Sequence, residues 1–184
     1  MEELSGHTDI LITFSFILTV LGFACNIILS DSARESKYFM HLGDSNGLIK
    51  PSFLTSHNFT VDVFIGRSGN ADVKASLYVL VGGAQSDINE SKNNITFSSF
   101  TKALSRSLYL SPSETLSLCF HFFIDGKNKA LLISSGSQRA AIDLEEVDTL
   151  RIAFVVTSSE VFDQGTISID SSESAWVSVW WKAP

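Results

Sequence analysis

The three tryptophans of the chain lie close together near its C-terminus, in the segment AWVSVWW (175–181). Successive side chains of a β-strand point to opposite faces, so Trp176 and Trp180 share one face and Trp181 takes the other. Two aligned aromatic rings can stack against a sugar ring or hold a protein partner. The alternative is that Trp176 and Trp180 fill the core while Trp181 covers an edge. All three are therefore candidate ligand-binding residues.

A histidine in the apolar run LSLCFHFFI (116–124) is the fourth candidate. Phe120 and Phe122 point to the face opposite His121, which favours a surface or groove position for the imidazole over a metal site. In the same run we expect Cys119 to be a buried thiol that packs as a small hydrophobe. A Cys25–Cys119 disulfide would require Cys25 to be retained. The sequence suggests no metal site and no cofactor.

Patterns typical of catalysis are missing from the sequence. There is no Gly-x-Ser-x-Gly turn of the kind that exposes a nucleophilic serine between a strand and a helix. Glu145 and Glu146 lie in a polar cluster, which offers no apolar pocket to keep one of two carboxyls protonated. We therefore expect no enzyme, and a hydrolase or transferase whose site is assembled in space is kept as an alternative.

Three N-glycosylation sequons occur, at Asn58-Phe59-Thr60, Asn89-Glu90-Ser91 and Asn94-Ile95-Thr96. N-linked sugars are attached in the secretory pathway, so the sequons predict an exported protein with glycans at Asn58, Asn89 and Asn94.

An uncharged run, ILITFSFILTVLGFACNIILS (10–30), lies near the N-terminus. It is long enough to cross a bilayer, and small residues that suit cleavage follow its most apolar part. We interpret residues 1–30 as a secretory signal helix, although the acidic residues before it are unusual for one. The alternative is an uncleaved signal-anchor, in which residues 10–29 tether the domain to a membrane.

Residues 31–184 have room for one domain. The formal net charge is −7 and the 13 Lys and Arg residues are scattered along the chain. Because no basic stripe is present to neutralise phosphates, nucleic acid is an unexpected partner. A membrane would be a partner only through an uncleaved N-terminal helix.

Short apolar runs recur about every ten residues and are separated by turn residues, which is typical of an all-β antiparallel sandwich, here jelly-roll-like. Asp125-Gly126 predicts a hairpin, residues 150–156 read as a strand buried on both faces, and 85–94 read as a polar loop. The expected strands are 38–42, 59–65, 73–81, 95–100, 107–110, 116–124, 130–134, 150–156, 166–170 and 175–181.

Two runs, FIGRSGNADVKASLYVLVGG (64–83) and CFHFFIDGK (119–127), together with LSPSE (110–114), resemble the domain named after farnesoic acid O-methyltransferase. The resemblance covers roughly 37–169 and implies a secreted β-sandwich used as an interaction module. It implies no methyl transfer, because the chain has no glycine-rich methyl-donor loop. QRAAIDLEEVDTLRIAF (138–154) is similar to the closing strands of galectins and laminin-G-like jelly rolls, but the sugar-binding signature of galectins is absent.

Together these features predict a secreted, non-enzymatic binding module whose partner is a carbohydrate or an extracellular protein. Sandwiches present their loops at the two ends, so we expect 66–70, 85–94 and 134–139 to carry recognition. A membrane-tethered adhesion ectodomain is the first alternative, and the enzyme named above is the second.

Overall fold

The computed structural model describes residues 38–44, 47–48, 53–144, 148–158 and 166–184. By its contacts the chain divides into two units, Met1–Glu35 and Ser36–Pro184, and every described residue belongs to the second. The signal helix expected in 1–30 lies outside the described residues, so it stays a prediction. In the described ranges no helix is long and apolar enough to span a bilayer.

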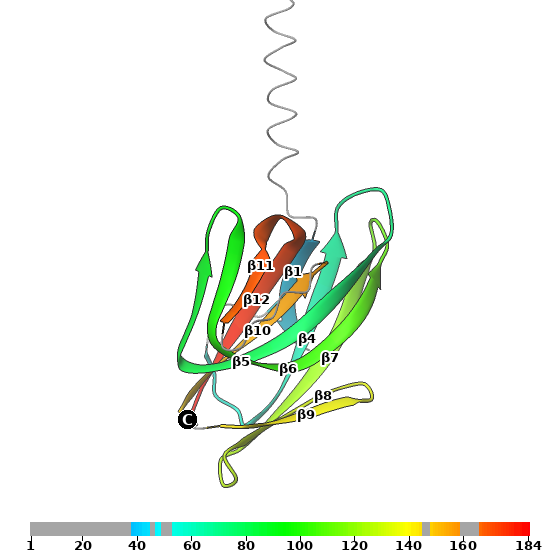
Figure 1. Cartoon of the computed structure of the whole chain (residues 1–184). Helices are drawn as coiled ribbons and strands as arrows, with labels where there is room; N and C mark the ends of the chain where they lie inside the picture. The colour runs from blue at the N-terminus through cyan, green and yellow to red at the C-terminus, as the bar shows by residue number, and fades with distance from the viewer. Residues whose placement is uncertain (1–37, 45–46, 49–52, 145–147, 159–165) are drawn as a thin grey trace, which may run out of the picture. The chain divides into compact units, whose positions relative to one another are not determined.

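The described chain is almost entirely strand (Figure 1). Its first six strands are β1 (Tyr38–Asp44), β2 (Gly47–Leu48), β3 (Phe53–Leu54), β4 (Asn58–Arg67), β5 (Val73–Glu90) and β6 (Asn94–Leu110). The later elements are β7 (Thr115–Asp125), β8 (Ala130–Ser135), β9 (Gln138–Asp143), β10 (Thr149–Thr157), β11 (Thr166–Asp170), the 3₁₀ turn η1 (Ser171–Glu173) and β12 (Ser174–Lys182).

These strands form two six-stranded sheets, which confirms the all-β sandwich. Sheet A has the order β2-β1-β4-β7-β8-β9, and sheet B has the order β11-β6-β5-β10-β12-β3. Neighbouring strands are antiparallel except for the two-residue pairing of β12 with β3, which is parallel.

The main core lies between the two sheets and follows from period-two alternation. Val61, Val63 and Ile65 on β4 are completely buried, as their spacing predicts. Phe120 and Phe122 on β7 point into the same core and contact Phe154 on β10. One face of each strand is therefore committed to the core, and the intervening residues of sheet A point to solvent.

A second, smaller core covers the opposite face of sheet B. Tyr78 and Leu80 on β5, with Ala153 and Val155 on β10, point away from the main core and are buried. Side chains from residues 94–100 of β6 and from β11 cover them: Ile95, Phe97, Phe100, Ile167 and Ile169. The double-sided burial predicted for 150–156 is thereby confirmed.

The polar loop expected at 85–94 is wrong. β5 continues through Gly82 and Gly83 to Glu90, and it pairs with a single long β6 in place of the two short strands expected there. The register shifts between Gly82 and Asp87. There the four residues 83–86 of β5 lie opposite a single residue of β6, Ser99, which is a bulge in β5. Beyond the bulge, Ile88 packs against the second core. The polar side chains that suggested a loop belong to the hairpin of β5 and β6, and most of them lie on its exposed face.

The Asp125-Gly126 hairpin is confirmed. The Asp125 carboxylate accepts hydrogen bonds from the backbone N–H groups of Lys127 and Asn128, both at 3.1 Å, and from the side-chain amide of Asn128 at 2.7 Å. These bonds hold the pKa of Asp125 below its usual value, since they favour the ionised form. A β8–β9 hairpin follows that the sequence did not predict.

Candidate functional site

The face of sheet A that points away from sheet B carries the exposed side chains with the most chemistry. Across β4 and β7 this outer face presents three pairs: Asn58 opposite Phe123, Thr60 opposite His121, and Asp62 opposite Cys119. Two further strands continue these pairs across the sheet. Leu132 on β8 and Ala141 on β9 follow Phe123, and Ser134 on β8 and Arg139 on β9 follow His121.

The pairs between β4 and β7 are close because of where the backbone hydrogen bonds fall. Ile124 N–H donates to the carbonyl of His57 at 2.8 Å, so His57 and Ile124 form a hydrogen-bonded pair. Bonded and non-bonded pairs alternate along an antiparallel ladder, which makes Asn58–Phe123 a non-hydrogen-bonded pair. In such pairs the Cβ atoms lie about 4.5–5.5 Å apart. Side chains on this face are therefore held within contact distance of each other.

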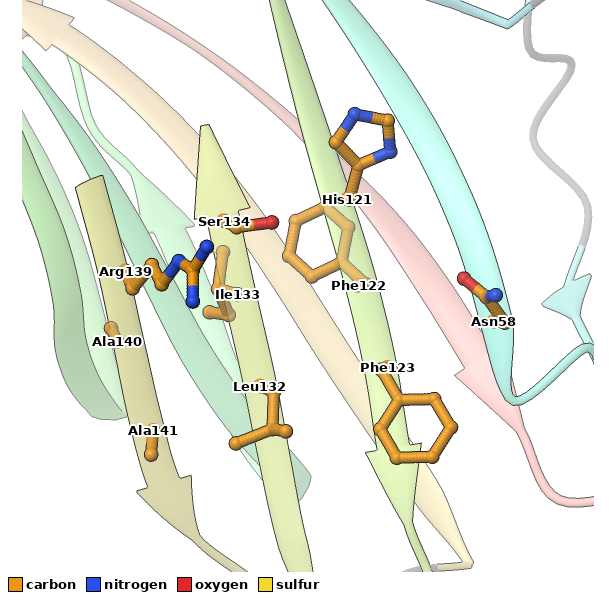
Figure 2. A pocket seen from close by; sticks show the side chains of 10 residues that line it. All are labelled: Asn58, His121, Phe122, Phe123, Leu132, Ile133, Ser134, Arg139, Ala140 and Ala141. Carbon is orange, nitrogen blue, oxygen red and sulfur yellow. The ribbon is translucent and has the colours of Figure 1, made fainter. Parts of the chain in front are cut away.

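A shallow groove of about 550 Å³ runs across this face (Figure 2). We call it the outer-face groove, and its lining is Asn58, His121, Phe122, Phe123, Leu132, Ile133, Ser134, Arg139, Ala140 and Ala141. Its volume falls within the range of about 300–1,000 Å³ typical of small-molecule sites. Figure 2 shows the Arg139 side chain directed from β9 toward Ser134 on β8.

Two large apolar side chains lie exposed in the groove, Phe123 at 46% and Leu132 at 43% of their full surface. They are strand partners on β7 and β8. Phe39, at 48%, is equally exposed on sheet A but lies outside the groove, where its ring covers Gly66 on the neighbouring strand. An exposed Phe–Leu pair surrounded by polar groups is a common feature of ligand sites.

His121 lies on the surface at the groove, as its alternation with Phe120 and Phe122 predicts. Its Nδ1 hydrogen bonds with Thr60 Oγ1 at 3.0 Å, and its Nε2 lies 3.7 Å from Cys119 Sγ. Within the described part of the chain, no group of three His, Cys, Asp or Glu residues is placed to hold a metal ion.

Cys119 is exposed, so its predicted burial is wrong. It has the same strand parity as His121 and therefore points to the outer face, whereas Leu118 and Phe120 point inward. Partial desolvation raises the pKa of the Cys119 thiol, and a hydrogen bond to Asp62 and the charge of that carboxylate raise it further. A raised pKa leaves little thiolate at neutral pH, which is the opposite of what a nucleophilic cysteine needs.

Replacing Asp62 by Asn is expected to speed alkylation of Cys119 by iodoacetamide a few-fold at pH 8. Loss of the carboxylate charge lowers the thiol pKa and increases the reactive thiolate fraction. Peptide mass mapping of a time course gives the rate at Cys119 alone. Asp143→Asn, an exposed acid on β9, is the matched control and should leave the rate unchanged. An equal rate in wild type and Asp62→Asn would show that Asp62 does not control this thiol.

The tryptophans occupy β12 with the alternation expected, and the orientation is the reverse of the alternative in which Trp176 and Trp180 fill the core. Trp181 is completely buried in the main core, and its Nε1–H donates to the carbonyl of Ser56 at 2.8 Å. The alternative in which it covers an edge is therefore wrong, because its pairing with Leu150 on β10 turns it inward. A buried indole of this kind offers no surface to a ligand.

Trp176 and Trp180 are half-buried on the other face of β12. Trp176 packs edge-on against Phe97 in the second core, and the guanidinium of Arg151 lies 5.0 Å from the Trp180 ring. Partial burial lowers the pKa of Arg151, and the charge of Asp87 opposes that shift. Both rings thus have partners within the domain, and a ligand platform on them stays a prediction.

The sequon asparagines are all exposed, but they lie on strands and not in a loop. Asn89 is near the end of β5 and Asn94 begins β6, at the far end of their hairpin. Asn58 begins β4 and is the one sequon residue of the three that lines the outer-face groove.

The large exposed groove residues missed by the sequence analysis are Phe123 and Leu132. The parity of β7 was the available signal, since Phe123 lies two residues after His121 and shares its face. Of the three loops expected to carry recognition, 134–139 proves to be the β8–β9 hairpin, and Ser134 and Arg139 at its ends do line the groove.

A second groove of about 540 Å³ lies beside the β5 bulge, between 81–86 and the end of β9. Much of its lining is glycine, alanine and serine, and its one aromatic side chain, Phe100, is buried. It offers polar side chains, among them Gln85, Thr101 and Asp143, but none of the exposed large apolar side chains of the described residues lines it.

No protein-family model and no curated protein matches the sequence. A solved structure, the β-glucosidase of Kluyveromyces marxianus in complex with glucose, aligns with 77% of this chain at 9% identity and a TM-score of 0.31. The aligned part is 15% of the length of that enzyme. A similarity of this size supports no inference about the fold or function of this chain.

Proposed function

We propose that this chain is a non-enzymatic extracellular binding domain and that it binds carbohydrate in the outer-face groove. The observation that carries the proposal is the exposed pair Phe123 and Leu132, which lies among the polar side chains of Asn58, His121 and Arg139. An apolar floor with a few polar groups around it is how small-ligand sites combine affinity with orientation.

A pyranose ring matches this surface in both respects. Its C–H face is apolar and stacks on an aromatic ring such as Phe123. Its hydroxyl groups need donors and acceptors, which the guanidinium of Arg139, the hydroxyl of Ser134 and the amide of Asn58 supply. These groups come from β4, β7, β8 and β9, so one sheet fixes their spacing.

The chemistry of the groove favours binding over turnover. Glycoside hydrolysis uses a pair of carboxyl groups at the scissile bond, whereas the described lining contains neither Asp nor Glu. The nearby Cys119 has a raised pKa, which disfavours nucleophilic attack.

Export, glycosylation and a jelly-roll-like strand order are part of this proposal. The uncharged run at 10–30 and the three sequons support export. The resemblance to the farnesoic acid O-methyltransferase-type domain supports an interaction role. An uncleaved leader would present the same groove at a membrane surface, as an adhesion ectodomain.

Replacing Phe123 by Ala is expected to weaken glycan binding by about tenfold or more, because a stacked ring contributes up to roughly 1.5 kcal/mol beyond its buried area. The full chain with Asn58→Gln, which frees the groove of any attached sugar, is screened on a glycan array and the ligands found are titrated. Phe39→Ala is the matched control, since it removes an equally exposed ring outside the groove. Flat binding across the array, or equal affinity in Phe123→Ala, would remove the proposal.

A further inference from the structure

We infer that an N-glycan on Asn58 folds back into the outer-face groove and stacks its first N-acetylglucosamine on Phe123. The groove then holds the protein's own sugar, and a free carbohydrate reaches it only where Asn58 carries no glycan. The inference rests on the proposed carbohydrate-binding character of the groove, but it does not require that a foreign glycan binds there.

The sequon Asn58-Phe59-Thr60 places its acceptor amide directly in the groove lining. Both hydrogen bonds of Asn58 within the described residues are made by its backbone, with the hydroxyl of Ser56. Asn58 is exposed, and Figure 2 shows its side chain on the strand beside the one that carries His121 and Phe123. The amide nitrogen of its side chain is therefore open to a glycan.

Strand register brings the attachment point and the aromatic ring together. Asn58 and Phe123 form a non-hydrogen-bonded pair, the closer of the two kinds of cross-strand pair. A sugar on the amide nitrogen begins one side-chain length above the sheet and beside the exposed Phe123 ring. Leu132, on the far side of Phe123, continues the apolar surface under the next sugar.

The covalent step is ordinary N-glycosylation. The amide nitrogen of Asn58 forms a bond to C1 of a sugar carried on a lipid diphosphate, the lipid diphosphate leaves, and the amide gives up one proton. The secretory pathway supplies this donor, and no oxidant or reductant is needed.

Endoglycosidase protection tests the inference. The full chain is produced in secretory cells that attach uniform high-mannose glycans, and cleavage between the two core N-acetylglucosamines is followed by peptide mass mapping. We expect native Asn58 to be cleaved about tenfold more slowly than Asn94, which is exposed outside the groove. Phe123→Ala should bring the Asn58 rate up to that of Asn94, whereas Phe39→Ala should not.

Three outcomes would overturn the inference: Asn58 without a glycan, equal cleavage rates at Asn58 and Asn94, or an Asn58 rate that Phe123→Ala leaves unchanged. A titration with N,N′-diacetylchitobiose separates it from the proposed function. Asn58→Gln protein should bind this disaccharide about tenfold more tightly than the glycosylated wild type. If Asn58→Gln protein does not bind it but the Asn58 glycan is protected through Phe123, the self-occupied groove stands and binding of this probe as a foreign ligand fails.

Discussion

Replacing Trp181 by Ala is expected to lower the free energy of unfolding by about 3–5 kcal/mol, the range for truncating a large buried aromatic side chain. Trp181 is completely buried, and its indole N–H bonds the carbonyl of Ser56, 125 residues earlier in the chain. Its ring also lies edge-on to His57, with centroids 5.6 Å apart. One side chain thus ties β12 to the segment that leads into β4 and the groove. Urea unfolding followed by circular dichroism measures the loss.

Trp180→Ala is the matched control, because Trp180 is the adjacent residue and is only half-buried. We expect it to lose less than half as much stability as Trp181→Ala. Trp181→Phe keeps most of the ring but leaves the Ser56 carbonyl unpaired, so an intermediate loss of about 1–3 kcal/mol is expected. Equal losses in Trp181→Ala and Trp180→Ala would contradict the inward orientation of Trp181.

Replacing Phe97 by Ala is expected to cost a similar amount, about 3–5 kcal/mol, because Phe97 is the centre of the second core. It is completely buried and meets Phe100 and Trp176 edge-on, with centroids 5.8 and 6.1 Å away. Hydrogen exchange should show the greatest loss of protection in β11 and in residues 94–100 of β6, which this ring holds against β5 and β10.

The neighbouring Ser98→Ala is the control for Phe97, since its side chain points to the other face of β6. A surface change of this kind is expected to alter stability by about 0.5 kcal/mol or less. If Phe97→Ala were as mild as Ser98→Ala, residues 94–100 of β6 could not be packing over β5 and β10 as described.

Local signals in the sequence predicted the features that depend on strand period and turn chemistry. The Asp125-Gly126 hairpin and the inward face of Val61, Val63 and Ile65 are of this kind. The apolar run at 150–156, which Arg151 alone interrupts, even indicated that both faces of its strand are covered.

Features that depend on pairing between distant strands could not be predicted in this way. Parity separates Trp181 from Trp176 and Trp180, but only the register of β12 on β10 decides which of them turns inward. Likewise, the alternating polar residues of 85–94 suit a solvent loop or a hairpin with one buried face, and the second core decides between them.

The candidate site shows the same division. Sequence parity placed His121 on a surface, and the same rule applies to Phe123. Neither the partners Leu132 and Arg139 nor the proximity of Asn58 follows from local pattern, because β4, β7, β8 and β9 meet only in the folded sheet. The sequon at Asn58 therefore became informative about the groove only when its cross-strand neighbour was known.

Saturation transfer from the aromatic protons of the protein to N,N′-diacetylchitobiose tests the central claim most directly, using full-length Asn58→Gln protein. Occupation of the outer-face groove predicts transfer to the sugar ring protons that is lost in Phe123→Ala and retained in Phe39→Ala. No transfer to the disaccharide, or undiminished transfer in Phe123→Ala, would contradict the binding of a free carbohydrate on the outer face of sheet A.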